Sequence, residues 1–180
     1  MPERNDRVAR IQRQWARERP DLDVRPQGVI GRLHRLAGHL TEELLVVYRR
    51  YGLAEGEFDV LATLRRAGSP FELAPGELAA HTMVTTGAIT KRLDRLERAG
   101  LITRRTSARD ARARVVGLTD AGRRLIDEAI TAHLRNERRL LDMLTPDQAD
   151  QLEALLADWL AHFEPPIAVE NDVVVIKKRF

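Results

Sequence analysis

The stretch PGELAAHTMVTTGAITKRLDRLERAGLI, residues 75–102, has the pattern of two short helices joined by a tight turn. Leu78 and Ala79 fall on the inner face of the first helix, where the small side chains of Ala79 and Ala80 allow a close crossing. Thr85 is placed to cap the second helix. This pattern predicts a helix-turn-helix, with an ordinary two-helix hairpin as the alternative from this segment alone.

The second helix of this stretch has one apolar side and one polar side. Its apolar side carries Ile89, Leu93 and Leu96, and Gly100 ends it. Hydroxyl residues and a glycine near a helix N-terminus let the backbone approach phosphates, and longer side chains on the polar side reach base edges in the major groove. The residues expected to contact DNA from this helix are Thr85, Thr86, Gly87, Thr90 and Lys91.

The hydrophobic period changes after this helix. Residues 101–106 and 113–119 are predicted as two short strands joined by a strongly basic loop. An arginine at such a tip can enter a minor groove, and Asp110 can orient its guanidinium through a bidentate pair. The hairpin therefore predicts a winged helix-turn-helix. The wing residues expected to contact DNA are Arg109, Asp110, Arg112 and Arg114.

Long amphipathic helices flank this core. Val8, Ile11 and Trp15 form a narrow apolar stripe on a first helix that ends near Pro20. A second helix runs through residues 30–47 and stops near Gly52. After the core, Thr119 caps a long helix, and the sequence TPDQ at 145–148 starts another.

The last helix has an apolar face wider than a surface helix needs. Its apolar residues are Leu152, Leu155, Leu156, Trp159, Leu160 and Phe163. A terminal helix of this kind usually meets the same helix from a second copy. We therefore expect a homodimer that binds double-stranded DNA at a pseudo-palindromic operator, with half-sites about one helical turn apart.

The predicted fold is mainly α, with a small β-hairpin wing, a winged helix-turn-helix core and terminal helices that form a dimerisation domain. The N-terminal helices (1–52) are expected to contribute to the dimer and to a ligand site. The DNA-binding core follows (53–119), then the C-terminal dimerisation helices (120–164). The tail (165–180) has no assigned role; its VVVI run favours either a flexible tail or an added edge strand.

Composition excludes several classes of function. The formal net charge of the 180 residues is +3, and because the lysines are only Lys91, Lys177 and Lys178, nearly all positive charge is arginine, which suits phosphate and carboxylate recognition. The absence of cysteine excludes disulfides and thiolate metal sites. Histidines lack metal-ligand spacing and no catalytic constellation appears, so we expect no metal, no cofactor and no enzyme. Without a signal-like or membrane-length apolar run, a cytoplasmic protein without membrane contact is expected.

Three segments resemble the MarR family of dimeric winged-helix transcription factors. They are GEFDVLATL, GELAAHTMVTTGAITKRLDRLERAGLITR and RDARARVVGLTDAG, and the likeness extends over residues 1–164. The resemblance implies that Arg112 is the minor-groove residue and that Asp110 is its orienting partner. It also implies a regulator that represses transcription more often than it activates it.

Within that family, QWARERPDLD with GEFDVLATLRRAG and TKRLDRLERAGLITRR resembles the urate-responsive, PecS-like branch. The resemblance implies a small-molecule effector, urate or a related anion, bound by Trp15, Asp59, Arg92 and Arg104. The residues themselves leave other roles open: packing for Trp15, a solvated carboxylate for Asp59 and a phosphate contact for Arg104. Arg92 borders the buried face of its helix, where a charge requires a partner.

The implied mechanism is release from DNA. A planar anion would enter between Trp15 and the winged core, be neutralised by Arg104 and Arg92, and repel Asp59, which displaces the recognition helix. One alternative is the same fold with another ligand, such as a phenolic acid, a tricarboxylate or a purine nucleotide. A second alternative is a DNA-architectural or protein-binding module without a ligand, in which Trp15 only packs.

Overall fold

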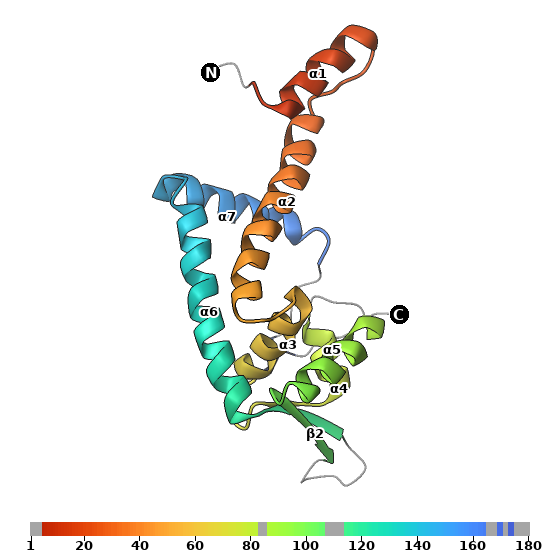
Figure 1. The fold of residues 1–180 in the computed structure, drawn as a ribbon. Helices are drawn as coiled ribbons and strands as arrows, with labels where there is room; N and C mark the ends of the chain where they lie inside the picture. Colours follow the sequence, from red (N-terminus) through yellow and green to blue (C-terminus); the bar gives the residue numbers. More distant parts are fainter. Residues whose placement is uncertain (1–4, 83–85, 107–113, 165–168, 171–172, 175–180) are drawn as a thin grey trace. The chain divides into compact units, whose positions relative to one another are not determined.

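The computed structural model describes residues 5–82, 86–106, 114–164, 169–170 and 173–174. The described chain is mainly helical with a small antiparallel sheet, which confirms the predicted fold class (Figure 1). The chain folds as two units, residues 1–46 and residues 47–180. No helix within the described ranges combines the length and the apolar character that crossing a membrane requires.

The N-terminal unit contains helix α1 (Arg7–Glu18) and most of helix α2 (Gln27–Arg50). Val8 and Ala9 are its buried hydrophobic residues within the described part of the chain. Val8 lies against Gly31 of α2, where an added Cβ would come within 3.3 Å of Val8 Cγ1. The two helices therefore approach each other through one small contact.

Polar contacts fix the start of α1 and the turn after it. Asp6 is the N-cap residue: its carboxylate accepts a hydrogen bond from the Ala9 backbone N–H at 2.8 Å and pairs with Arg32 of α2, also at 2.8 Å. Gln12 donates a side-chain hydrogen bond to the Val24 carbonyl at 2.9 Å. Exposed or half-buried polar groups thus connect α1 to α2 and to the turn between them.

The winged core is built from three short helices. They are α3 (Glu55–Arg66), α4 (Pro75–His81) and α5 (Thr86–Arg98). Helix α3 packs against α4, α5 and α6, and so lies at the centre of this unit (Figure 1). The largest fully buried side chains of the described residues are Val60, Leu61, Leu64, Leu78, Leu96, Ile102, Val116 and Ile126.

A three-stranded antiparallel sheet completes the core. Its order is β1 (Glu72–Leu73), β3 (Arg114–Leu118) and β2 (Ile102–Thr106), with Ile102 opposite Leu118. The predicted hairpin is β2 and β3. Strand β1 was not predicted, because two residues are too few to show an alternating pattern.

Helix α6 (Asp120–Leu141) starts where the sequence predicted. The Thr119 hydroxyl accepts a hydrogen bond from the Gly122 N–H at 2.9 Å and donates one to the Gly100 carbonyl at 2.8 Å. A Cβ added to Gly122 would collide with the carbonyl oxygen of Leu101. The glycine therefore allows the first turn of α6 to sit directly on the loop that ends α5.

Helix α7 (Pro146–Leu160) begins with the predicted capping box. Thr145 accepts a hydrogen bond from the Gln148 N–H at 3.3 Å, and the Gln148 side chain accepts one from the Thr145 N–H at 3.0 Å. No residue of α7 is buried in the single chain. Leu155 is 68% exposed and Leu160 is 52% exposed, so the helix leaves large apolar side chains at the surface of the described chain.

Within the tail, β4 (Val169–Glu170) pairs with β5 (Val173–Val174) in an antiparallel ladder, with Val169 opposite Val174. The β-prone valines thus find their partner strand inside the tail itself.

Candidate nucleic-acid interface and anion site

Helix α5 has the two faces that the sequence predicted. Ile89, Leu93 and Leu96 are buried, and Thr90 and Lys91 are exposed. The exposed pair is therefore available to a DNA groove. Of the other residues predicted on this surface, Thr86 and Gly87 contribute their backbone to the first turn of α5, and Thr85 lies outside the described residues.

The described part of the wing is strongly basic. Arg114 is exposed at the start of β3, whereas Arg109, Asp110 and Arg112 lie outside the described residues. Arg105 on β2 pairs with Glu72 on β1 at 2.6 Å, which ties the two outer strands together across β3. The Arg105–Glu72 ion pair and the pairing with β3 thus fix the strands of the wing to one another.

An ion pair joins α5 to α3. Arg95 Nε lies 3.0 Å from Glu57 Oε1, and the Glu57 side chain is only 4% exposed. The second carboxylate oxygen accepts a hydrogen bond from the Ala54 N–H at 2.8 Å, so Glu57 caps α3 while it holds α5. The sequence reasoning missed Glu57, although a glutamate at the third position of a helix is a known capping signal.

Arg92 lies over the N-terminal turn of α3. A Cβ added to Gly56 would collide with the Arg92 side chain, so the guanidinium rests where only a glycine leaves room. Among the described residues, Arg92 Nη1 is buried and has no hydrogen-bond partner. Asp59 is half-buried and follows Gly56 by three residues, so it shares that face of α3. Arg92 of α5 therefore lies against the face of α3 that carries Gly56 and Asp59.

Asp59 is also electrostatically linked to Tyr48, the buried tyrosine near the end of α2. Burial raises the pKa of Tyr48 to about 12, and the negative charges of Glu55, Glu137 and Asp59 add to the effect. The Tyr48 hydroxyl lies 3.3 Å from His133 Nδ1 on α6. The sequence reasoning did not find this contact, because its partners are 85 residues apart.

Arg104 contacts the other flank of α5. Its Nη2 lies 2.5 Å from Asp94 Oδ1 and its Nε lies 3.4 Å from Glu97 Oε2. Asp94 follows Arg92 by two residues, which is about 200° around a helix. Arg92 therefore faces α3 while Arg104 meets α5 from the side of β2.

Trp15 belongs to the N-terminal unit, where its side chain is 45% exposed. It lines a shallow pocket of about 350 Å³ formed with Leu22, Asp23, Val24, Pro26 and Gln27. The unit thus presents an aromatic face that its own residues do not cover.

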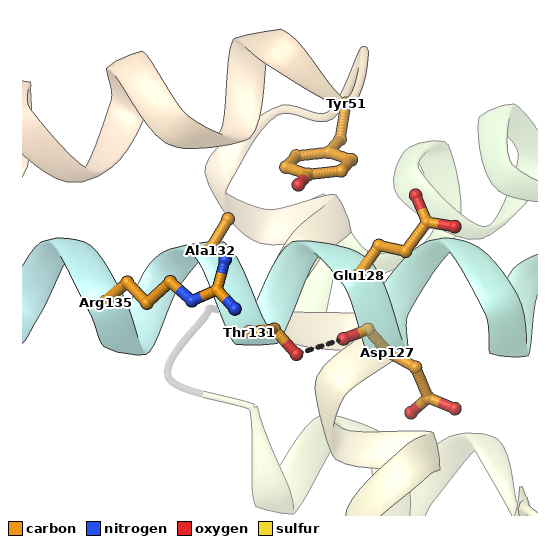
Figure 2. Close-up of a pocket in the computed structure, with 6 residues that line it drawn as sticks. All are labelled: Tyr51, Asp127, Glu128, Thr131, Ala132 and Arg135. Carbon is orange, nitrogen blue, oxygen red and sulfur yellow. Dashed lines mark hydrogen bonds between the residues drawn. The ribbon is translucent and has the colours of Figure 1, made fainter.

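A second pocket, of about 370 Å³, lies along α6 (Figure 2). Figure 2 shows the ring of Tyr51 facing α6, with Glu128 and Arg135 at either side and the Thr131 hydroxyl donating to the Asp127 carbonyl at 2.7 Å. The Asp127 carboxylate is engaged by Arg65 from α3. The lining residues are Tyr51, Asp127, Glu128, Thr131, Ala132 and Arg135. Neither Arg92 nor Asp59 lines this pocket.

Comparisons with known proteins show the family of this chain. A model of the MarR family matches residues 51–113. The chain is 41% identical over 149 residues to the HTH-type transcriptional regulator PecS of Dickeya dadantii, covering 83% of this chain and 90% of that protein. It is 31% identical to the HTH-type transcriptional repressor YetL of Bacillus subtilis, covering 59% of this chain and 64% of that protein.

Solved structures share the fold. The apo form of wild-type MarR from E. coli superposes with a TM-score of 0.60 at 28% identity, covering 73% of this chain and 96% of that chain. Sco3205 of Streptomyces coelicolor, a MarR family regulator solved in complex with DNA, gives a TM-score of 0.70 at 24% identity, covering 80% and 91%.

The fold and the two-faced α5 define a class of protein: a winged helix-turn-helix, DNA-binding transcriptional regulator rather than an enzyme. The chain belongs to the MarR family.

Proposed function

We propose that this protein is a homodimeric repressor that a small planar anion, such as urate, releases from its operator. The observation that carries the ligand response is the buried Arg92 Nη1, which has no hydrogen-bond partner among the described residues. A buried donor left unsatisfied costs about 1–3 kcal/mol, and more when it is charged. An anion that accepts from this nitrogen would recover that cost, so Arg92 favours a negatively charged ligand at the contact of α5 with α3.

Asp59 gives the bound anion a route to the recognition helix. An anion at Arg92 would bring a second negative charge to the face of α3 on which Asp59 lies. Two like charges about 4 Å apart interact by roughly 4 kcal/mol at an effective dielectric near 20, and by less after screening. Coupling of about 1–3 kcal/mol changes affinity about 5- to 150-fold. Repulsion of this size between the anion and Asp59 is sufficient to shift α5, because Arg92 of α5 lies against the face of α3 that carries Asp59.

Trp15 enters this proposal through the family resemblance and its identity as an exposed aromatic residue. Its flat ring suits a planar ligand, because aromatic faces stack on planar groups. Replacing Trp15 by Ala should weaken the ligand response more than DNA binding. Equal loss of both would favour a packing role.

The homodimer is supported by the apolar residues that the single chain leaves exposed. They are Leu134, Leu141, Met143, Leu152, Leu155, Leu156, Leu160 and Phe163 in the C-terminal helices and the segments that follow them. Monomeric proteins rarely expose so large an apolar surface. A two-fold dimer carries two α5 helices, which is the arrangement that a pseudo-palindromic operator with half-sites about one turn apart requires.

Ligand release can be tested with a DNA duplex that the protein itself selects from a random pool. Duplex affinity and melting temperature are measured with urate up to millimolar concentration, for the natural protein and for Arg92→Gln. We expect urate to raise the melting temperature and weaken DNA binding, and Arg92→Gln to lose both responses. Arg135→Gln, an exposed arginine on α6, is the matched control and should respond normally.

The outcomes separate the alternatives. If urate has no effect but another small anion, such as a phenolic acid, a tricarboxylate or a purine nucleotide, shifts the melting temperature, the ligand assignment is wrong and the anion site stands. If no anion changes DNA affinity, the protein is a ligand-independent DNA-binding module.

The wing is tested separately by Arg112→Ala, which alters a residue outside the described ranges. Loss of a groove-inserted arginine should cost on the order of 1–3 kcal/mol of DNA affinity. Unchanged affinity would remove Arg112 from the DNA-binding surface.

A further inference from the structure

We infer that Asp94 and Glu97 are positioning residues for DNA binding, because they clamp Arg104 and thereby fix the recognition helix α5 to the wing strand β2. We call these three residues the α5 clamp. The inference rests on DNA being read by α5, and it holds whether or not a ligand releases the DNA.

The geometry of the clamp is two-pronged. Arg104 Nη2 meets Asp94 Oδ1 at 2.5 Å, and Arg104 Nε lies 3.4 Å from Glu97 Oε2. Asp94 and Glu97 are three residues apart, so both carboxylates project from one flank of α5. The Arg104 side chain is 26% exposed. Its Nη2 donates a hydrogen bond to Asp94, whereas its Nε is buried and forms no hydrogen bond, so the contact with Glu97 is an ion pair only.

The clamp complements the contacts on the other flank of the same helix. Towards α3, Arg95 pairs with Glu57 and Arg92 lies over Gly56. Charged contacts on both flanks therefore fix the rotation of α5 about its axis, while Thr90 and Lys91 stay exposed. A small rotation would move those two side chains relative to the wing. If α5 binds the major groove while the wing binds the adjacent minor groove, the position of α5 relative to the wing must be kept.

For Asp94→Asn, the clamp and simple charge repulsion predict opposite changes in DNA affinity. Asp94 lies on the helix that meets DNA, so removing its negative charge should strengthen binding to phosphate if the charge acts only through repulsion. If Asp94 positions α5, Asp94→Asn should weaken binding instead, on the order of tenfold. Glu97→Gln should have a smaller effect, because its contact to Arg104 is longer.

Salt dependence separates positioning from direct contact. A lysine or arginine that binds a phosphate contributes about one unit to the slope of log affinity against log salt. Lys91→Gln should lower both the affinity and this slope. Arg104→Gln should lower the affinity with the slope unchanged, because its charge is already paired within the protein.

The experiment measures duplex affinity at several salt concentrations for the natural protein, Asp94→Asn, Glu97→Gln, Arg104→Gln and the Asp94→Asn/Arg104→Gln double variant. The duplex is one that the natural protein selects from a random pool. Glu128→Gln, an exposed carboxylate on α6, is the control for loss of one negative charge. Melting temperatures are measured for the same set.

The clamp predicts that Asp94→Asn weakens DNA binding and that the double variant is no weaker than Arg104→Gln. Tighter DNA binding by Asp94→Asn, or a reduced salt slope in Arg104→Gln, would overturn it. If the natural protein selects no duplex, the proposed function fails and the positioning role fails with it. If it selects a duplex, additive losses of melting temperature in the double variant would overturn the clamp, because they would show that Asp94 and Arg104 do not act through each other.

Discussion

The N-terminal unit and the winged core are stabilised by different kinds of contact. In the N-terminal unit, exposed or half-buried polar groups such as Asp6 and Arg32 support a small apolar contact at Val8. In the winged core, fully buried side chains such as Leu64 and Leu96 surround α3. Burial of a leucine side chain contributes about 1.5–3 kcal/mol, whereas an exposed ion pair contributes about 0–1 kcal/mol.

This difference indicates which part of the molecule can change shape at small cost. Segments with few buried contacts open with low free energies, and buried helices open close to the global value. The core keeps α5 and the wing in a defined relation, as reading DNA requires. The N-terminal unit carries an aromatic residue, Trp15, on elements that are easier to move.

The largest effect is expected in the core. Leu64 is 0% exposed, and Leu64→Ala should lower the free energy of unfolding by about 2–5 kcal/mol through lost burial and a cavity. Denaturant unfolding measures the loss, with Leu22→Ala in the N-terminal unit as the exposed counterpart. A larger loss in Leu22→Ala would reverse the comparison between the units.

The next effect contrasts two helical glycines. Gly122→Ala should destabilise the protein by about 1–3 kcal/mol, because the new Cβ meets the Leu101 carbonyl oxygen. Gly38→Ala in α2 should stabilise it by about 0.5–1 kcal/mol, because its Cβ enters open space in the single chain and glycine is a poor helix residue. Thermal unfolding of both variants tests the contrast. Equal signs would contradict it.

A smaller effect is expected at Glu57, the buried carboxylate that caps α3 and pairs with Arg95. Glu57→Gln keeps an oxygen that can accept the Ala54 hydrogen bond but loses the charge, and because Arg95 is 62% exposed the cost should be about 1 kcal/mol. Urea unfolding measures it. High salt screens the pair and should reduce the difference in stability between the natural protein and the variant. A difference that salt leaves unchanged would show that the ion pair is not its cause.

The smallest effect is expected at Asp6 and depends on pH. The hydrogen bond from Arg32, and then that from the Ala9 N–H, hold the pKa of Asp6 below its ordinary value of 3.8. The folded state therefore gains stability from Asp6 above about pH 4, and this gain is lost as pH falls through the lower folded pKa.

Hydrogen exchange of the α1 amides can measure this contribution in the natural protein and in Asp6→Ala. The difference should be constant near neutral pH and disappear in strong acid. A difference that persists unchanged in strong acid would assign the effect to packing rather than to the charge.

Much of the fold could be predicted from local sequence patterns. The caps at Thr119 and Thr145, the buried stripe of α5 and the two main wing strands all depend on residues within a few positions of one another. Strand β1 was not predictable in this way, because its pairing with β3 joins residues more than 40 positions apart.

The candidate sites also combine features that local sequence determines with features that only the packing of separate elements determines. The sequence by itself determined that α5 has a polar face with Thr90 and Lys91, since helical periodicity fixes which side chains share a face. Only the tertiary structure showed that Arg92 lies over Gly56 on one flank, and that Asp94 and Glu97 hold Arg104 on the other. These contacts depend on how separate elements pack, and periodicity within one helix contains no information about which charged group a neighbouring element brings to it.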